Sequence, residues 1–250
     1  MTGTTQIHDN SPRSLVVIPT YNEAENVSDI IQAVFSHGNG FHVLIVDDNS
    51  PDKTAEIARE IQVVHPDRLF ILQREGKLGL GTAYLEGFKF GLDNGYDYIF
   101  EMDADFSHNP QDLPRFLKAM KDVDMVVGSR YVRGGDIKNW SNYRIFLSYG
   151  ASLYVRLITW MPFKDPTAGF VCYKASLLKA LDFDKIKLRG YSFQIELKYY
   201  AYKKGFKIKE IPITFIDRER GVSKMNSNII SEAIKGVLSL TVKGLSGYYK

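Results

Sequence analysis

The chain lacks the features that mark a disulfide scaffold, a zinc protein or a membrane span. Cys172 is the one cysteine in 250 residues, which excludes an intrachain disulfide and suits a reducing compartment. The five histidines show no zinc-like spacing. The best candidate for a membrane span, residues 145–161, carries Arg156 and is shorter than the roughly 20 clean apolar residues that a bilayer requires. Residues 1–14 are polar and contain no apolar core of a signal peptide.

The net charge of +3 is too small to indicate nucleic-acid binding. Hydrophobic residues make up 44% and charged residues 24%, as in ordinary globular proteins, and no repeat or Gly/Ser linker divides the chain. We therefore expect a disordered lead-in over residues 1–14, one domain over residues 15–225, and a C-terminal amphipathic helix over residues 226–250. Such a protein is soluble, or peripheral on a membrane.

Short apolar runs alternate with helical patterns along the first half of the chain. Runs at residues 15–18, 42–46, 69–72, 98–101 and 125–127 predict buried strands, each apolar on both faces. Between them, Asn22 with Glu25 forms a capping-box pattern, and Ser50 followed by Pro51 predicts the start of another helix. This alternation predicts an α/β fold with a mostly parallel central sheet and helices on both faces. Such sheets bind ligands beyond the carboxyl ends of their strands.

The most informative motif is the acidic pair Asp103 and Asp105, which follows the predicted strand at residues 98–101. Because successive side chains of a strand alternate between faces, the two carboxylates are expected to project the same way. Two converging carboxylates form a hard oxygen site for Mg²⁺ or Mn²⁺ that leaves positions open for phosphate oxygens. The motif therefore predicts a divalent ion that bridges a diphosphate.

Two further groups follow the first two predicted strands. Pro19, Tyr21 and Glu23 offer a fixed turn, a flat ring and a carboxylate acceptor, which suit a nucleoside; an ordinary strand-to-helix turn explains them equally well. A carboxylate at Asp47 or Asp48 can hold a ribose hydroxyl or a base N–H. An Asx-type turn is an equally good explanation of Asp47, so ligand binding is favoured for Asp48.

Three further segments, which contain glycine or basic residues, are candidate parts of the ligand site. Residues 77–82, Lys-Leu-Gly-Leu-Gly-Thr, precede a predicted helix and suit either an anion or a tight turn. Arginine matches phosphate bidentately, although a solvated charge run is the usual explanation of a basic set such as Arg130, Arg133, Lys138 and Arg144. The segment from Arg218 to Lys224 contains a glycine and predicts a loop that closes over a diphosphate; the alternative is a surface loop.

Two apolar stripes at helical spacing lie in the second half of the chain. One runs from Tyr143 to Met161 with Arg144, Ser148, Ser152 and Arg156 on another face, and the second runs over residues 229–245. Either the stripes pack on the domain, or they dock the protein on a membrane surface as interfacial helices do.

Together these motifs resemble glycosyltransferase family 2, and most closely its dolichyl-phosphate (polyprenyl-phosphate) mannosyltransferases. The resemblance extends from Leu15 to about Lys224. It rests on the segments beginning Val17 (Val-Ile-Pro-Thr-Tyr-Asn-Glu), Val46 (Val-Asp-Asp-Asn-Ser-Pro-Asp), Lys77 (Lys-Leu-Gly-Leu-Gly-Thr-Ala-Tyr), Met102 (Met-Asp-Ala-Asp-Phe-Ser-His-Asn-Pro), Gly128 (Gly-Ser-Arg-Tyr), Asp165 (Asp-Pro-Thr-Ala-Gly-Phe) and Gly190 (Gly-Tyr-Ser-Phe-Gln-Ile-Glu), and on the Arg218 to Lys224 loop.

The resemblance implies a GT-A nucleotide-sugar fold and a role for each matching residue. Asp103, Asp105 and Ser107 would form the Mg²⁺ or Mn²⁺ site, with Asp105 the main ligand. Arg130, Arg133 and Arg144 are the candidates for the acceptor phosphate, and the catalytic set would be Asp105, Arg130, Arg144 and Arg218. The donor would be held by Pro19, Tyr21, Glu23, Val46, Asp48, Asp103, Ala104, Asp105, Arg130, Arg218 and Lys224.

The implied reaction is inverting transfer of mannose from GDP-mannose to a polyprenyl monophosphate. The alternative keeps the lipid-phosphate acceptor but changes the sugar to glucose, N-acetylglucosamine or an aminosugar. A nucleotidyltransferase is disfavoured, because it would want glycine and cations directly after the first strand, where residues 19–23 have neither. The implied location is peripheral on the cytoplasmic face of a membrane. The resemblance also allows a membrane-anchored partner protein.

Overall fold

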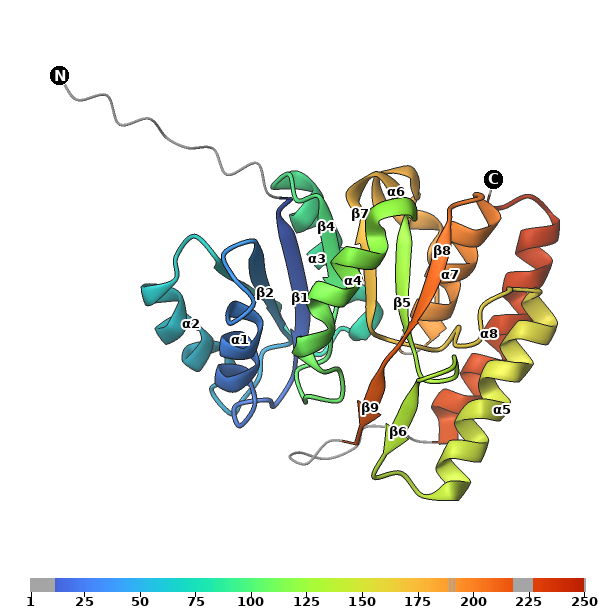
Figure 1. Ribbon diagram of the computed structural model, residues 1–250, viewed down its shortest axis with the longest axis horizontal. Helices are drawn as coiled ribbons and strands as arrows, with labels where there is room; N and C mark the ends of the chain where they lie inside the picture. Colours follow the sequence, from blue (N-terminus) through green and yellow to red (C-terminus); the bar gives the residue numbers. More distant parts are fainter. Residues whose placement is uncertain (1–11, 189, 191, 218–226, 250) are drawn as a thin grey trace.

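The structure is a computed structural model that describes residues 12–188, 190, 192–217 and 227–249, with the backbone alone for residues 227–233 (Figure 1). The strands are β1 (Ser14–Thr20), β2 (Phe41–Asp47), β3 (Leu69–Gln73), β4 (Tyr98–Glu101), β5 (Met125–Ser129), β6 (Asp136–Lys138), β7 (Val171–Lys174), β8 (Ile208–Pro212) and β9 (Thr214–Ile216). The helices are α1 (Val27–Phe35), α2 (Thr54–Val64), α3 (Leu80–Asp93), α4 (Leu113–Ala119), α5 (Asn142–Thr159), α6 (Ala175–Ala180), α7 (Ser192–Lys203) and α8 (Ser227–Leu245).

A seven-stranded sheet organises the molecule, in the strand order β3-β2-β1-β4-β7-β5-β8. β7 runs antiparallel to its neighbours β4 and β5, and the remaining neighbours are parallel. The predicted mostly parallel α/β sheet is therefore confirmed. The loops after β1, β2, β4 and β5 leave the sheet at one edge, the lower edge in Figure 1.

Alternate residues of the central strands are buried on opposite faces of the sheet. In β1, Leu15 and Val17 pack in one cluster with residues of α3, α6 and α7, whereas Val16 and Ile18 pack in a second cluster with residues of α1, α2 and α4. This two-sided burial is the reason that each strand reads as a continuous apolar run, without the alternation of a half-exposed strand.

Two predicted helix starts are wrong. α1 begins at Val27, and Asn22 lies in a turn with φ 57°, its N–H donating to Ser50 Oγ at 3.0 Å. α2 begins at Thr54, because Ser50 Oγ donates to the Asp47 carboxylate at 2.6 Å and is not available as a cap. Ser50 takes part in both cases, because its hydroxyl also accepts the Asn22 N–H from the loop after β1, 28 residues away, a contact that a local pattern cannot reveal.

A small second sheet lies beyond the lower edge of the main one. It consists of β6 and β9, which are parallel and place Ile137 opposite Phe215 (Figure 1). Trp140 follows β6, and its ring meets that of Phe215 edge-on at 5.2 Å. This sheet therefore joins the loop after β5 to the segment after β8.

Helix α5 turns most of its apolar stripe away from the domain. Tyr143 is 72% exposed, Phe146 73% and Leu157 65%, whereas the helix residues that are fully buried are Ser152, Val155 and Thr159. From the predicted stripe only a part packs inward, namely Tyr154, Ile158 and Met161. The interpretation of the whole stripe as core is thus wrong, and the side that carries Ser152 faces the domain.

Helix α8 extends this exposed surface. The two helices lie side by side at the right edge of Figure 1, joined by the Tyr154 hydroxyl to the Ile234 carbonyl at 3.1 Å. Val237 and Leu240 of α8 are fully buried, while Leu238, Val242 and Leu245 are 49%, 69% and 77% exposed. Within the described residues, no helix combines the length and the apolarity that a membrane crossing demands.

Candidate active site

The loops after β1 and β2 are bonded into one unit. Asp47 is fully buried and accepts hydrogen bonds from the Thr20 hydroxyl at 2.9 Å and from the Ser50 N–H at 2.9 Å. The Ala24 N–H donates to the Asp52 carboxylate at 3.0 Å. Asp47 therefore has the structural turn role that the sequence offered as its alternative, and it holds the two loops together.

Asp48 has a partner that the sequence analysis missed, Arg74, which follows β3. The Arg74 Nε donates to Asp48 Oδ1 at 2.6 Å, and both side chains are nearly buried. The same guanidinium donates to the Gly79 carbonyl at 3.1 Å and to the Thr82 hydroxyl at 2.7 Å. Burial raises the pKa of the Asp48 carboxyl, although the Arg74 cation acts in the opposite direction. Asp48 thus ties the glycine-containing segment at the start of α3 to the edge of the sheet.

The other predicted donor residues differ in how accessible they are. Tyr21 is partly exposed, and the Lys77 ammonium lies 4.8 Å from its ring centroid. Glu23 is 8% exposed and accepts from the Asn26 side-chain amide at 2.9 Å. Pro19 lies within β1, and Val46 is fully buried in the core. A ligand could therefore meet Val46 through its backbone alone.

The acidic pair lies on a turn and not on a strand, which corrects the geometric argument from the sequence. β4 ends at Glu101, and Phe106 has a φ of 61°. The Asp103 carboxylate is 36% exposed and accepts from the Tyr84 hydroxyl at 3.3 Å. The carboxylate of Asp105, which is 8% exposed, accepts the Ser107 N–H at 3.1 Å. Turn geometry, and not strand alternation, decides how the two carboxylates point.

His108 holds this turn from within the core, a role with no signal in the histidine spacing. Its Nδ1 accepts the Asp103 N–H at 3.1 Å, and its ring stacks on Phe170 at 5.1 Å. Because Nδ1 is an acceptor, the proton of the neutral ring is assigned to Nε2. Burial lowers the pKa of His108, which keeps the ring neutral.

The donor atoms at the turn fit a divalent cation that also binds phosphate. Mg²⁺ is commonly held by one or two carboxylates together with substrate phosphates. Asp103 and Asp105 supply two carboxylates, with buried Ser107 beside them. Within the part of the chain that the structure describes, no cluster of three or more His, Cys, Asp or Glu side chains forms a complete metal site. The remaining ligands would therefore have to come from a diphosphate and water.

The basic side of the site is organised around Trp140. The guanidinium carbons of Arg144 and Arg130 lie 4.0 and 5.9 Å from its ring centroid. Arg144 also pairs with Asp217 at 2.7 Å. The structure thus brings together two of the three predicted acceptor residues, whereas Arg133 is exposed on the loop between β5 and β6. Arg218 and Lys224 lie outside the described residues.

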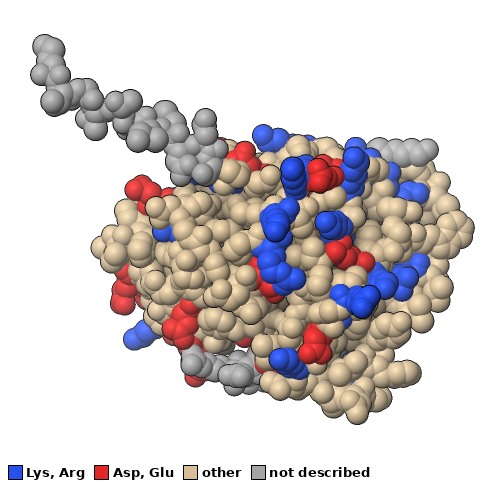
Figure 2. Space-filling model, viewed as in Figure 1, with Lys and Arg blue, Asp and Glu red and all other residues tan. Residues whose placement is uncertain are grey.

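A basic cleft of about 410 Å³ lies apart from these residues. It is lined by Arg115, Lys118, Ala119, Lys209, Ile211 and Pro212. Figure 2 shows Lys and Arg side chains gathered over this face, where α4 and β8 lie in Figure 1. The cleft contains none of the predicted donor, metal or acceptor residues.

Sequence comparisons identify similar proteins over almost the whole chain. Residues 15–182 match the family described as glycosyl transferase family 2. Polyprenol monophosphomannose synthase of Mycolicibacterium smegmatis is 44% identical over 233 residues, which cover 93% of this chain and 88% of that protein. Undecaprenyl-phosphate mannosyltransferase of Micrococcus luteus is 42% identical over 225 residues, which cover 90% and 92% of the two chains.

Comparison with solved structures shows the GT-A fold. Glucosyl-3-phosphoglycerate synthase from Mycobacterium tuberculosis, in complex with Mn²⁺, UDP and glucosyl-3-phosphoglycerate, superposes with a TM-score of 0.65 at 15% identity, covering 94% of this chain and 80% of that one. Its complex with Mn²⁺, UDP-glucose and phosphoglyceric acid gives a TM-score of 0.66 at 16% identity, with 93% and 80% covered. At this level of identity the likeness concerns the fold alone.

Proposed function

The chain belongs to glycosyl transferase family 2, and from this premise we propose that it transfers mannose from GDP-mannose to a polyprenyl monophosphate. The products are polyprenyl-phosphate β-mannose and GDP. The observation that carries the proposal is the 44% and 42% identity to two relatives, both named for transfer of mannose to a polyprenyl phosphate. The exposed apolar face beside two arginines supports a lipid phosphate as acceptor.

The loops after β1, β2 and β3 form the donor side in this proposal. Tyr21 and Glu23 meet the guanosine, while Asp48 accepts from a ribose hydroxyl or base N–H, held in place by Arg74. The glycine-containing segment before α3 lies next to this pair. Arg74 thereby joins the predicted donor residues as a group that orients Asp48.

At the diphosphate, Asp103 and Asp105 would hold Mg²⁺ or Mn²⁺, with Ser107 beside them, and such a cation would supply positive charge to offset that of the leaving GDP. Tyr84 and His108 orient the turn through their bonds to Asp103. Arg218 and Lys224 are assigned to the same phosphates from the sequence.

The acceptor phosphate needs positioning more than activation. A phosphate monoester is largely ionised at neutral pH, since its second pKa is about 6. One of its oxygens forms the new bond to C1 of mannose while the bond from C1 to the diphosphate oxygen breaks, and GDP leaves with that electron pair. Attack from the opposite side inverts C1 and requires no enzymic base. Arg130 and Arg144, gathered around Trp140, hold the attacking phosphate.

The outward faces of α5 and α8 dock the enzyme on the bilayer in this proposal. A polyprenyl chain stays in the membrane, so the enzyme must approach its surface. Tyr143, Phe146 and Leu157 of α5 and Val242 of α8 offer apolar side chains that are 65% to 73% exposed. Arg144 begins the same helix that carries this face. The location is therefore peripheral on the cytoplasmic face, with or without a membrane-anchored partner protein.

The test supplies the purified chain with several nucleotide sugars and one polyprenyl phosphate in liposomes, and identifies the lipid product by mass spectrometry. We expect mannosyl-phosphoryl lipid from GDP-mannose and none from UDP-glucose or UDP-N-acetylglucosamine. The matching free polyprenol is the control, and it should remain unmodified. Preferential transfer from another donor would show that the enzyme transfers a different sugar. Equal use of the polyprenol would refute the proposal that the phosphate is the nucleophile.

A further inference from the structure

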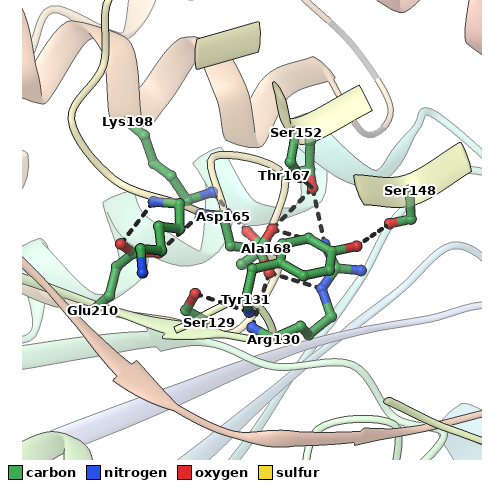
Figure 3. A network of polar contacts seen from close by, with 11 residues as sticks. Ser129, Arg130, Tyr131, Ser148, Ser152, Asp165, Thr167, Ala168, Lys198 and Glu210 are labelled. Atoms are coloured by element: carbon green, nitrogen blue, oxygen red, sulfur yellow. Dashed lines mark hydrogen bonds and ion pairs between the residues drawn. The ribbon is translucent and has the colours of Figure 1, made fainter. Parts of the chain in front are cut away.

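Arg130 is held by a set of buried hydrogen bonds through its backbone N–H, Nε and Nη2. Its Nε and Nη2 donate to the two oxygens of Asp165, both at 2.8 Å, and its backbone N–H donates to the same carboxylate at 3.0 Å (Figure 3). Nη2 also donates to Thr167 Oγ1 at 2.8 Å. No residue within the described ranges bonds to Nη1, and Arg130 lines a small cavity with His108 and Phe215. Nη1 is therefore the donor left for a ligand.

Hydrogen bonds also hold Asp165 and the loop that carries it. It is fully buried, and its backbone N–H, like that of Lys164, donates to the Glu210 carboxylate, at 2.8 and 2.7 Å (Figure 3). Farther along the same loop, the buried Lys198 ammonium donates to the Ala168 carbonyl at 2.6 Å. The Arg130 cation holds the pKa of the Asp165 carboxyl below its ordinary value, so Asp165 is ionised at neutral pH.

The inward face of α5 reaches the same group. Ser152 and Thr167 share a hydrogen bond between their hydroxyls at 3.0 Å, and Thr167 donates in turn to Asp165 at 3.0 Å. Ser148, one turn earlier in α5, accepts the Tyr131 hydroxyl at 2.8 Å (Figure 3). The helix that exposes its apolar stripe is thus bonded through its polar face to the residues around Arg130.

We infer that Asp165 and Thr167 are positioning residues that fix the Arg130 guanidinium so that Nη1 meets the acceptor phosphate. The inference rests on the proposed function for the identity of that anion. A free arginine side chain loses rotamer freedom when it binds an anion, and bidentate pairing with Asp165 removes that freedom before the phosphate arrives. The carboxylate also cancels the charge of the arginine, so orientation, and not net charge, is what Asp165 provides.

This distinction gives the inference a specific test with Asp165→Asn and Thr167→Val. If charge alone mattered, Asp165→Asn would add a net positive charge and improve use of the phosphate. We expect the opposite, a loss of about 10²-fold in kcat/KM for a short water-soluble prenyl phosphate, and about tenfold for Thr167→Val. The affinity for GDP, measured by calorimetry, should change less than twofold in both variants (roughly 0.4 kcal/mol).

Two further variants separate positioning from general damage. Thr167→Ser keeps the hydroxyl and should restore kcat/KM to within about twofold of the parent. Thr159→Val is the matched control, because Thr159 is also buried and its hydroxyl donates within α5, to the Val155 carbonyl at 2.6 Å. It should leave kcat/KM unchanged even if its melting temperature falls as far as that of Thr167→Val. Normal turnover in Asp165→Asn and Thr167→Val would overturn the inference, as would an equal loss in Thr159→Val.

A spectroscopic readout keeps this test independent of the proposed reaction. The Nε–H resonance of Arg130, assigned by its absence in Arg130→Lys, should exchange slowly with water in the parent and quickly in Asp165→Asn and Thr167→Val. Unaltered exchange in both variants contradicts the positioning role whatever the substrate. Full turnover in Arg130→Ala would instead refute the place of Arg130 in the proposed function.

Discussion

Helices α1 and α5 carry similar apolar patterns and end in opposite environments. α1 connects β1 to β2 and buries Val27, Ile30, Ile31, Val34 and Phe35 against the sheet. α5 lies at the edge of the molecule and exposes Tyr143, Phe146 and Leu157, while Ser152 faces inward. An apolar stripe therefore contributes to folding only where a neighbouring element covers it. On α5 most of the stripe is uncovered, and polar bonds together with the buried Val155 attach the helix to the domain.

We expect the largest loss of activity from a substitution in the part of the molecule that contains α1, at the turn after β4. Asp105→Ala should lower transfer by about 10³-fold or more, because it removes a carboxylate that we propose as a ligand of the cation at the diphosphate. The melting temperature should stay within a few degrees, since the turn lies outside the strands. EDTA should reproduce the loss in the parent, and Mg²⁺ or Mn²⁺ should reverse it. Activity that survives both treatments would refute the metal assignment.

A charge placed on the buried face of α1 tests the comparison directly. Val34 is fully buried, so Val34→Asp should lower the free energy of unfolding by about 3 kcal/mol or more, a large part of the total of a domain. Urea denaturation followed by circular dichroism measures this change. Val63→Asp is the control, because Val63 is 81% exposed on α2, and its unfolding curve should match the parent.

The same type of substitution on α5 should have the reverse outcome. Leu153 and Leu157 are 40% and 65% exposed, so replacing both with Asp should leave the free energy of unfolding within about 0.5 kcal/mol of the parent. Binding to liposomes, measured by co-sedimentation, should weaken by about tenfold to 100-fold as apolar contact with the bilayer is lost. Transfer to a short water-soluble prenyl phosphate should continue. Unfolding of this variant would show that the stripe belongs to the core, and unchanged liposome binding would refute the docking proposal.

At the start of α5, Arg144→Ala should separate acceptor use from donor use. We expect a loss of about tenfold in kcat/KM for the prenyl phosphate, because a charge-assisted contact is removed, and little change in GDP affinity. Arg156→Ala, on the same helix, is the matched control and should behave as the parent with the water-soluble acceptor. Equal losses for acceptor and donor would argue against an acceptor role for Arg144.

The smallest effect concerns Glu101, a fully buried residue of β4. Burial raises the pKa of its carboxyl from 4.5 to about 8, against the nearby Lys198 cation. The folded protein therefore holds this proton more tightly than the unfolded chain, and the stability it provides is lost as the pH rises towards about 8. Glu101→Gln should melt close to the parent near pH 5 and several degrees higher near pH 8. A constant difference across this range would contradict the raised pKa.

The predictions from sequence succeeded best for the strands and for the positions of the loops that follow them. Apolar runs marked β1 to β5, and the family motifs predicted the fold. They failed where side chains bond across loops, as Ser50 Oγ does with the Asn22 N–H, and where β4 ends before the acidic pair. The roles of Arg74 and His108 were missed because their partners, Asp48 and the Asp103 N–H, become neighbours only in the folded chain.

The amino-acid pattern alone predicted β1 to β5 and the residue types at the site, because a buried strand is marked by a local run of apolar residues and a loop by its own composition. The pairing of Arg130 with Asp165, 35 residues away, and of Arg144 with Asp217, 73 residues away, follows from the folding of the whole chain. The tertiary structure also decided which face of α5 is covered. Periodicity specifies that a helix has an apolar face, but burial of that face depends on elements that the chain brings to it from elsewhere.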